Sequence, residues 1–503
     1  QMCIRDSYEI DTLRLLTVAF GMYGSSNKSN SDGSTVMYGA NYEDVAYSYR
    51  TDNHGKSSWF SINGNVDYQR TSKKNKQRMI TLSYKVNTQP QTSDSYSTYL
   101  DILPDERKDE LIENLKLYNY HSDGKTNTME QTFQVDYTTP IGKLHTIETG
   151  VKYIFRRNSS DNKFYEAAGG SNDYAYNEDR SSDYRHLNHI LSAYAGYTLR
   201  YKDFTFKPGL RYEQTIQRVK YIVGPGENFH TNFSDLVPSV SLGMKIGKTQ
   251  NIRAGYNMRI WRPGIWNLNP YFDDQNPMFI SQGNPDLKSE KSHAFDVAYS
   301  RKLSESYSMA VTLRYIRSDM GTDQNEESNA GNAFSADISG YLEKYVLMGN
   351  AEALWSFGFN LSNIGSKISY DGGNTNQYLP AKLTLGTGLL YPIDDYNQIG
   401  VYLDLNKYMV PYAPQKEEGE TDADYQTRVD DYKSWSSLSG MLKSFTDSPN
   451  GLLKEIMVSV GAEYSYNQQF FVRGGYFYEN ANVGNRKYFS VGAGFRMSVF
   501  QLD

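Results

Sequence analysis

The chain has 503 residues, with 58 acidic and 52 basic side chains and a net charge of −6. This interspersed, slightly acidic balance gives no basic face and argues against a nucleic-acid-binding protein. No run of 18 apolar residues occurs, which excludes a membrane-spanning helix, and the single Cys3 excludes an internal disulfide. A mean hydropathy of −0.67 with 44 tyrosines still fits a transmembrane β-barrel, because only alternate residues of its strands face lipid.

The first 33 residues have no clear strand or helix pattern. They begin "QMCIRDSYEI", which lacks the basic region, apolar core and cleavage site of a signal peptide. An outer-membrane protein needs such a signal. We therefore expect a truncated start, with "MCIRDS" as a cloning or sequencing scar. We predict that residues 1–33 are a leader or artefactual segment without a fold of their own.

From residue 34 onward, apolar and polar residues alternate. The alternation is clear in "FTFKPGLRYEQT" (204–215), "SMAVTLRYIRS" (308–318) and "LWSFGFNLSN" (354–363). A period of two predicts strands, and one apolar face opposite a polar or small one is typical of a barrel wall between lipid and a wet lumen.

The connections between these segments alternate between short and long. Short ones lie near 73, 140, 201, 246, 302, 392 and 466, and long ones lie around 90–127, 158–186, 223–234, 263–290, 320–331, 365–380 and 407–453. Bacterial outer-membrane barrels have short periplasmic turns and long outer loops. We predict an all-β, antiparallel outer-membrane β-barrel of about 18 strands, with composite origin or incomplete closure left open. A soluble β-sandwich or propeller is the alternative, but its strands are usually shorter.

One helix is expected inside the longest outer loop, in "DADYQTRVDDYKSWSSLSGMLKSF" (422–445). Apolar residues recur there near helical spacing, and Pro449, Asn450 and Gly451 are expected to end the helix. Such a helix either covers the barrel mouth or docks a partner. The candidate docking residues are Trp435, Leu438, Leu442 and Phe445.

Residues 128–298 resemble the barrel of Bacteroidetes-type TonB-dependent receptors. The resemblance is carried by "IETGVKYIFRRNSSDNKFY" (147–165), "GLRYEQT" (209–215), "LVPSVSLGMKIGKTQNIRAGYNMRIWRPGIWNLNPY" (236–271) and "GNPDLKSEKSHAF" (283–295). The motif residues of its loop are Arg259, Arg262, Pro263, Asn269, Pro270, Gly283, Asn284 and Pro285. The resemblance implies a plugged barrel of about 22 strands that imports an unidentified bulky nutrient with energy from the TonB system. We find no plug domain or TonB-box segment in the chain, so gated import does not follow from it alone.

The later part of the chain resembles a different family, PorV of the type IX secretion system. The matching stretches are "FDVAYSRKLSESYSMAVTLRYIRSD" (295–319), "GNAFSADISGYL" (331–342), "WSFGFNLSNIGSKISY" (355–370), "LPAKLTLGTGLLYPIDDYNQIGVYLDLNKYMVP" (379–411) and "VSVGAEYSYNQQFFVRGGYFYENANVGNRKYFSVGAGF" (458–495). This resemblance implies a FadL-like barrel that binds the signal domains of secreted cargo. We therefore expect a chimera of two partial barrels, 34–293 and 294–503, with the join near 294–301.

The distribution of histidine and cysteine limits enzymatic chemistry. Neither residue occurs after His293, which excludes a Ser-His hydrolase or a His/Cys metal site in the last part of the chain. The pair His186 and His189 is three residues apart on a predicted strand, so the two rings are expected on opposite faces and not as metal ligands. We predict no enzyme, no cofactor and no metal. A lipid-modifying enzyme with a carboxylate or tyrosine mechanism is the alternative.

The sequence thus predicts a protein of the cell outer membrane in contact with its lipid. Its first predicted function is cargo binding for type IX secretion by residues 294–503. The alternative is TonB-dependent uptake by residues 34–293, with the TonB system and a nutrient as partners.

Overall fold

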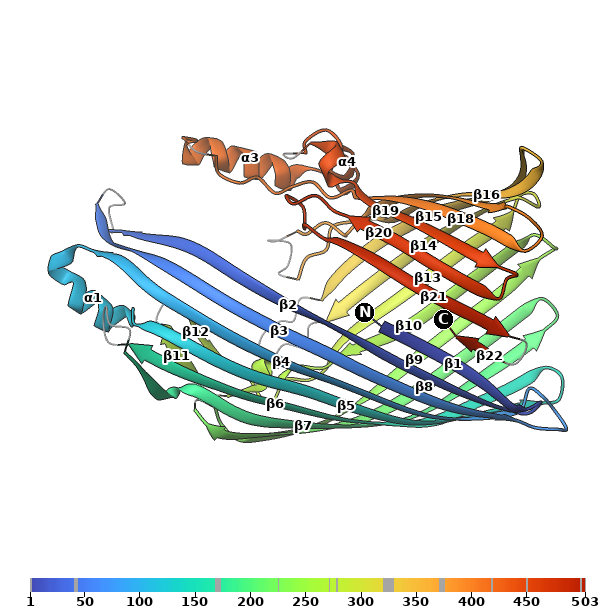
Figure 1. Ribbon diagram of the computed structural model, residues 1–503, viewed down its shortest axis with the longest axis horizontal. Coiled ribbons are helices and arrows are strands. Elements are labelled where there is room, and N and C mark those ends of the chain that lie inside the picture. The colour runs from blue at the N-terminus through green and yellow to red at the C-terminus, as the bar shows by residue number, and fades with distance from the viewer. Residues whose placement is uncertain are drawn as a thin grey trace.

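A computed structural model describes residues 2–39, 44–167, 173–224, 226–270, 272–276, 279–319, 330–370, 376–417, 419–448, 451–497 and 500–502. In this part of the chain, twenty strands form one antiparallel sheet that curves into a barrel, and two further strands form a separate hairpin (Figure 1). The prediction of an all-β, antiparallel barrel is therefore confirmed, with two strands more than the approximate number expected.

The strands of the sheet are β1 (Met2–Asp11), β2 (Arg14–Tyr38), β3 (Val45–Thr71), β4 (Met79–Leu103), β5 (Asn119–Ile141), β6 (His145–Ala167), β7 (Tyr174–Tyr201), β8 (Phe204–Val223), β9 (Phe229–Ile246), β10 (Gln250–Trp261), β13 (Glu290–Lys302), β14 (Tyr307–Asp319), β15 (Gly331–Met348), β16 (Ala351–Gly365), β17 (Lys382–Pro392), β18 (Asn397–Tyr408), β19 (Met457–Tyr466), β20 (Phe470–Tyr478), β21 (Lys487–Met497) and β22 (Phe500–Leu502). The hairpin is β11 (Phe272–Asn276) with β12 (Phe279–Gln282). The helices are α1 (Lys108–Leu115), α2 (Ile265–Leu268), α3 (Asp422–Ser434) and α4 (Ser437–Lys443), with 3₁₀ turns at Asp105–Arg107 and Leu452–Glu455. Among the described residues, no helix combines the length and apolar character needed to cross a membrane.

The barrel closes through its first and last strands. Each strand of the sheet pairs with the next one along the chain, β10 pairs with β13 across the hairpin, and β22 pairs with β1 at Asp6 and Leu502. The expectation that residues 1–33 have no fold was wrong, because β1 and β2 form a hairpin around Thr12 and Leu13. A closed barrel requires a pairing partner for its first and its last strand. Pairing between residues so far apart in the chain is not visible in the local residue pattern. That these residues are a leader or artefact stays a prediction.

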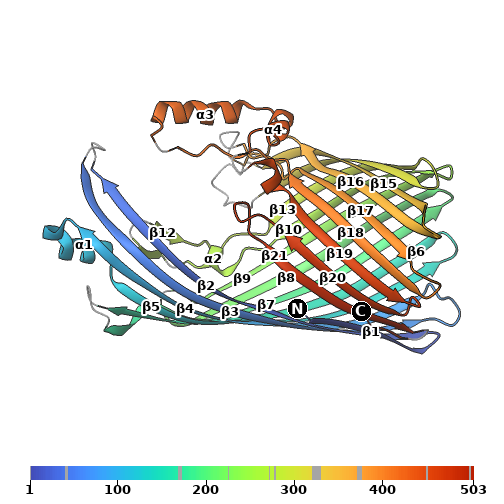
Figure 2. The same ribbon diagram turned by 45° about the horizontal axis from the view of Figure 1, so that its top comes forward.

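The strands differ greatly in length around the barrel. Strands β2–β7 have 23–28 residues each, whereas β17–β21 have 9–12. About 9–11 residues suffice to cross a membrane. Figures 1 and 2 show β2–β7 reaching far beyond the ends of the later strands. The predicted short turns are confirmed, but much of the loops expected at 90–127 and 158–186 is strand, since β4 continues to Leu103 and β6 to Ala167.

The extensions of β4–β7 are held together by a row of rings. Tyr96, His121, Tyr165 and Tyr176 are successive register partners on four neighbouring strands. The rings of Tyr96 and His121 stack with centroids 4.1 Å apart, and those of His121 and Tyr165 with centroids 5.5 Å apart. Cross-strand aromatic pairs can stabilise a sheet even where neither of its faces contacts lipid. Because the extensions need no apolar face, they lack the alternation from which the membrane-spanning strands were predicted.

The two faces of the wall differ as expected for a wet lumen. On the outer face, one row of register partners reads Tyr84, Phe133, Tyr153 and Leu191, and Phe133 and Leu191 are 48% and 56% exposed. On the opposite face, the adjoining row reads Ser83, Gln134, Lys152, Ser192, Glu213 and Asp235. The apolar outer face suits lipid, and the polar face lines the interior.

The predicted join at 294–301 falls inside one strand. Strand β13 pairs with β10 and with β14 over twelve consecutive positions on each side, without a register shift. The wall is therefore continuous across the predicted join.

Candidate functional site: the inner wall and its loop

Charged side chains gather on the inner face of β5–β10. They surround a cavity of about 820 Å³ that is lined by residues of β4–β10 and by Arg262. Its charged lining residues are Asp136, Glu148, Lys152, Lys207, Arg211, Glu213 and Arg262. Both signs of charge are present, with one more cation than anions. The wall thus offers donors and acceptors for a polar solute.

Most of these charges are paired across or along the strands. Glu148 and Lys207 lie 2.7 Å apart, and Arg211 Nε lies 2.8 Å from Glu213 Oε1. Glu213 is buried and also pairs with the guanidinium group of Arg262, which in turn donates to the hydroxyl of Thr215 at 3.2 Å. Two guanidinium groups therefore hold one buried carboxylate at the rim of the cavity.

Arg262 lies in a crowded cationic environment. Burial, and then the nearby Arg211 and Arg156 guanidinium groups, lower the pKa of Arg262. The guanidinium group of arginine nevertheless stays charged in proteins. The carboxylates of Glu213 and Glu130 are therefore structural counter-ions, and Glu130 accepts from Arg156 Nε at 2.9 Å.

The receptor-motif residues come together at the base of the loop between β10 and β13. The amide of Gly283 donates to Asn269 O at 2.8 Å, and the amide of Asn284 donates to Asn267 O at 2.7 Å. The side chain of Gln282 donates to the carbonyl of Pro270 at 2.9 Å. These bonds form a narrow neck that encloses the β11–β12 hairpin.

Backbone contact explains the glycine of this motif. A Cβ atom on Gly283 would lie 2.5 Å from Asn269 O and 2.7 Å from Asn269 N, closer than atoms of a folded chain approach. Only glycine allows the two sides of the neck to come this close.

Both ends of this loop are fixed to the inner wall. Arg262 pairs with Glu213 on β8, and the hydroxyl of Ser289 donates to the buried Asp235 on β9 at 2.7 Å. Glu213 and Asp235 are themselves register partners. Of the other motif residues, Pro263 is buried, Pro285 is half-buried and Arg259 is exposed on β10. The wall residues Glu213 and Asp235 were not singled out in the sequence, because only register brings them to the loop.

The expected helix of the longest outer loop is two helices. Helix α3 ends at Ser434, and the next residue, Trp435, has an extended backbone. Ser436 caps α4 by accepting from the amide of Ser439 at 3.2 Å. Serine competes with helix continuation in this way, which is why the single-helix prediction was wrong. Pro449 and Asn450, expected to end the helix, lie outside the described residues.

The four candidate docking residues separate into two pairs. Phe445 packs against the buried cluster of Ala381, Met409 and Met441, while the ammonium of Lys443 lies 3.7 Å from the ring centroid of Trp435. Leu438 and Leu442 are 61% and 64% exposed. Phe445 therefore holds α4 to the barrel, Trp435 contacts α4 within the loop, and Leu438 and Leu442 are exposed.

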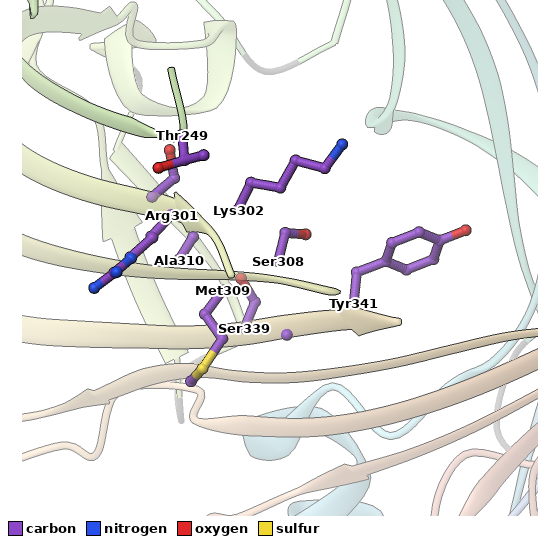
Figure 3. Close-up of a pocket in the computed structure, with 10 residues that line it drawn as sticks. Thr249, Arg301, Lys302, Ser308, Met309, Ala310, Ser339 and Tyr341 are labelled. Carbon is purple, nitrogen blue, oxygen red and sulfur yellow. The ribbon is translucent and has the colours of Figure 1, made fainter. Parts of the chain in front are cut away.

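A smaller cavity of about 400 Å³ lies at the short-turn end of β13–β15. Figure 3 shows Lys302, Ser308 and Tyr341 pointing to one side of these strands, with Arg301 and Met309 on the other. The hydroxyl of Tyr341 donates to Glu343 at 2.7 Å. This cavity is lined by both polar and apolar groups and lies at the opposite end of the barrel from the receptor-motif loop.

The histidine pair has the geometry predicted for it. His186 is buried with Nε2 2.8 Å from Gln217 Oε1, whereas His189 Nδ1 lies 2.7 Å from the hydroxyl of Tyr153 on the outer face. The two rings do not converge.

Comparisons with known proteins give one matching family and several solved structures of low similarity. The sequence model of the family described as "Outer membrane protein beta-barrel family" matches residues 71–429. No curated protein matches the chain. Similar solved structures include the ferric preacinetobactin receptor BauA from Acinetobacter baumannii (9% identity, 100% of this chain, 79% of that chain, TM-score 0.49), the copper transporter OprC (11%, 99%, 79%, 0.47) and the ferric yersiniabactin uptake receptor FyuA from Yersinia pestis (10%, 100%, 77%, 0.44).

Proposed function

Because the chain belongs to the outer membrane protein beta-barrel family, we propose that it forms the barrel of an uptake receptor of the TonB-dependent type. Family membership gives its location, the cell outer membrane, where lipid surrounds it. The observation that carries the proposal is the closed wall with a charged inner face, whose cavity adjoins the receptor-motif loop. The proposed role is passage and not catalysis.

The width of the barrel supports a bulky cargo. Barrels of 16–18 strands leave an aqueous channel, and barrels of 22 strands enclose a plugged lumen. Twenty strands lie between these sizes. The inner wall presents paired charges of both signs, with Lys152 facing the cavity without an ion pair to a described residue. A large, hydroxyl-rich or anionic nutrient suits this lining better than an apolar one.

Proteoliposomes test the route through the lumen. The full 503-residue chain is reconstituted with entrapped oligosaccharides of graded size, and their release is measured. We expect oligosaccharides to leave faster than from protein-free vesicles. Folded protein, verified by its heat-modifiable mobility in gel electrophoresis, that releases no solute would contradict the proposal.

A second candidate function is cargo binding for type IX secretion by the 407–453 loop. Exposed Leu438 and Leu442 on α4 favour it, because neighbouring apolar side chains on a helix are suited to a partner surface. The double variant Leu438→Ser/Leu442→Ser should lose retention on an immobilised cargo signal domain. The matched control, Leu303→Ser/Ile393→Ser, changes two exposed apolar residues at the opposite rim. Equal retention of both variants and the wild type would remove this candidate.

The division into a receptor-like part, 34–293, and a PorV-like part, 294–503, stays a prediction. Neither the family match, which runs from 71 to 429, nor the unbroken β13 supports a join near 294–301. Single long DNA reads across the codons for residues 285–305 test it. Reads that carry the intact frame would show that one gene encodes both parts, and reads that always break there would show that the chimera arose when the sequence was assembled.

A further inference from the structure

Four exposed cations lie together on the outer wall of β6–β8. The register places Arg157 of β6, Leu187 of β7 and Arg218 of β8 in one row. The next row contains Arg185 of β7 and Lys220 of β8. All four cations are exposed. Since register partners share a face, we treat Arg157, Arg185, Arg218 and Lys220 as one surface, the outer cation patch.

The outer cation patch borders the apolar band of the wall. The row directly beneath Arg157 and Arg218 contains Phe155, His189 and Ile216, and the row after that contains Tyr153 and Leu191. The short turns after β5 and β7 lie below these rows. Because such turns face the periplasm in bacterial outer-membrane barrels, the patch lies at the outer-leaflet edge of the band.

The four charges are close together and without partners in the wall. Neighbouring strands are about 4.8 Å apart and successive residues on one face about 6.8 Å apart, so the backbone positions fall within about 12 Å of each other. In the described part of the chain, none of the four forms an ion pair. The carboxylates of Asp161 and Asp183 lie one row further out, and neither pairs with the patch. Like charges this close repel unless an anion joins them.

We propose that the outer cation patch binds the phosphate groups of a phosphorylated glycolipid headgroup in the outer leaflet. Arginine guanidinium groups bind phosphate with two parallel hydrogen bonds, and three of the four cations are arginines. The lipid is favoured over a free anion, because the patch faces away from the lumen and borders the surface that acyl chains contact. Leu187 lies between Arg157 and Arg218 and offers an apolar contact to the same molecule. This inference is independent of the proposed uptake function.

The test compares one variant with a control of equal charge. The variant is Arg157→Gln/Arg185→Gln/Arg218→Gln/Lys220→Gln. The control replaces four exposed lysines of the short turns at the other end of the barrel, and its changes are Lys73→Gln, Lys74→Gln, Lys143→Gln and Lys248→Gln. Binding of bis-phosphorylated lipid A to the full chain in detergent is measured by native mass spectrometry. Dephosphorylated lipid A and inorganic phosphate serve as further probes.

We expect the patch variant to bind phosphorylated lipid A at least about tenfold more weakly than the wild type, while the control stays within about twofold. Dephosphorylated lipid A should bind the wild type as weakly as phosphorylated lipid A binds the variant. Equal binding of both lipids, or equal loss in patch and control variants, would overturn the proposal. Inorganic phosphate that displaces the lipid at equal concentration would also overturn it in favour of a simple anion site. Heat-modifiable mobility verifies that each variant is folded.

Discussion

A buried ion pair between Lys407 of the barrel and Glu455 anchors the longest outer loop. Lys407 Nζ, at the end of β18, lies 2.5 Å from Glu455 Oε2, and both side chains are nearly inaccessible. The hydroxyl of Ser448 donates to the same carboxylate. Removing one partner of such a pair leaves an unpaired buried charge, which destabilises by about 3–5 kcal/mol.

We therefore predict that Lys407→Met frees the loop. Hydrogen exchange of the α4 amides should become at least about a hundredfold faster, since about 2.7 kcal/mol corresponds to that factor. The double variant Lys407→Met/Glu455→Met should recover most of the protection, because it leaves no buried charge. Equal exchange in the single and double variants would show that the pair does not anchor the loop.

The glycine of the receptor-motif loop gives a second prediction at this scale. Gly283→Ala places a methyl group against the backbone of Asn269 and should weaken the neck by about 1–3 kcal/mol. Hydrogen exchange of the backbone amides of Asn269 and Asn284 should then become faster. Gly264→Ala is the matched control, since its Cβ would meet only Asn267 Oδ1 at 3.8 Å. Similar exchange in both variants would contradict the explanation of the motif by close approach.

The sequence marks some of these functional and structural residues but not others. The resemblance singled out Arg262 and Gly283, and the structure places both in one loop base. Lys407 and Glu455 were missed, because 48 residues separate them and nothing local marks a buried pair. Leu438 and Trp435 share a predicted helical stripe, but the helix is broken between them, and Leu438 is exposed while the ring of Trp435 contacts Lys443.

At the scale of elements, α3 is fixed by an ion pair that depends on pH. Arg428 donates to both oxygens of Glu420 at 2.7 Å and lowers the pKa of that carboxyl to about 2. A carboxyl with a lowered pKa stabilises the folded state above its ordinary value of 4.5 and loses this effect as the pH falls toward about 2.

We predict that protection of the α3 amides against hydrogen exchange falls between pH 4.5 and 2, after correction for the intrinsic rate. In Arg428→Gln the protection at pH 6 should be lower, and the part of the pH dependence that comes from Glu420 should be lost. A variant that keeps the wild-type pH profile would assign the change to the other carboxylates of the segment.

Local pattern was enough for the elements that touch lipid, and not for the others. "FTFKPGLRYEQT" alternates because one face meets acyl chains, and β8 begins at Phe204 as expected. The extension of β4 through Tyr96 has polar residues on both faces and was predicted as loop. Helix α1 was also missed, although Leu111 and Ile112 pack into a small core with Ile102 and Leu117, because its two turns are too short for a clear periodicity.

At the scale of the whole molecule, closure depends on the pairing of β1 with β22. Cysteines at the partner positions Asp6 and Leu502, with Cys3→Ser to remove the native thiol, should form a disulfide under oxidation. The cross-linked chain should resist unfolding and keep its compact gel mobility on heating. The pair Asp6→Cys/Val491→Cys is the control, because β21 is separated from β1 by β22. Equal cross-linking of both pairs would argue against a closed barrel.

The unequal heights of the wall determine the form of the opening. Strands β2–β7 rise far above the ends of β17–β21, so a plane through the rim cuts the barrel obliquely (Figure 2). An oblique section through a tube is an ellipse, whose area exceeds that of the circular cross-section. Diffusive encounter grows with the size of a target. The oblique mouth therefore meets more solute molecules per unit time than the mouth of the same barrel with strands of equal height. The extended wall of β2–β7 also lets a weakly bound solute diffuse along a surface instead of through bulk water.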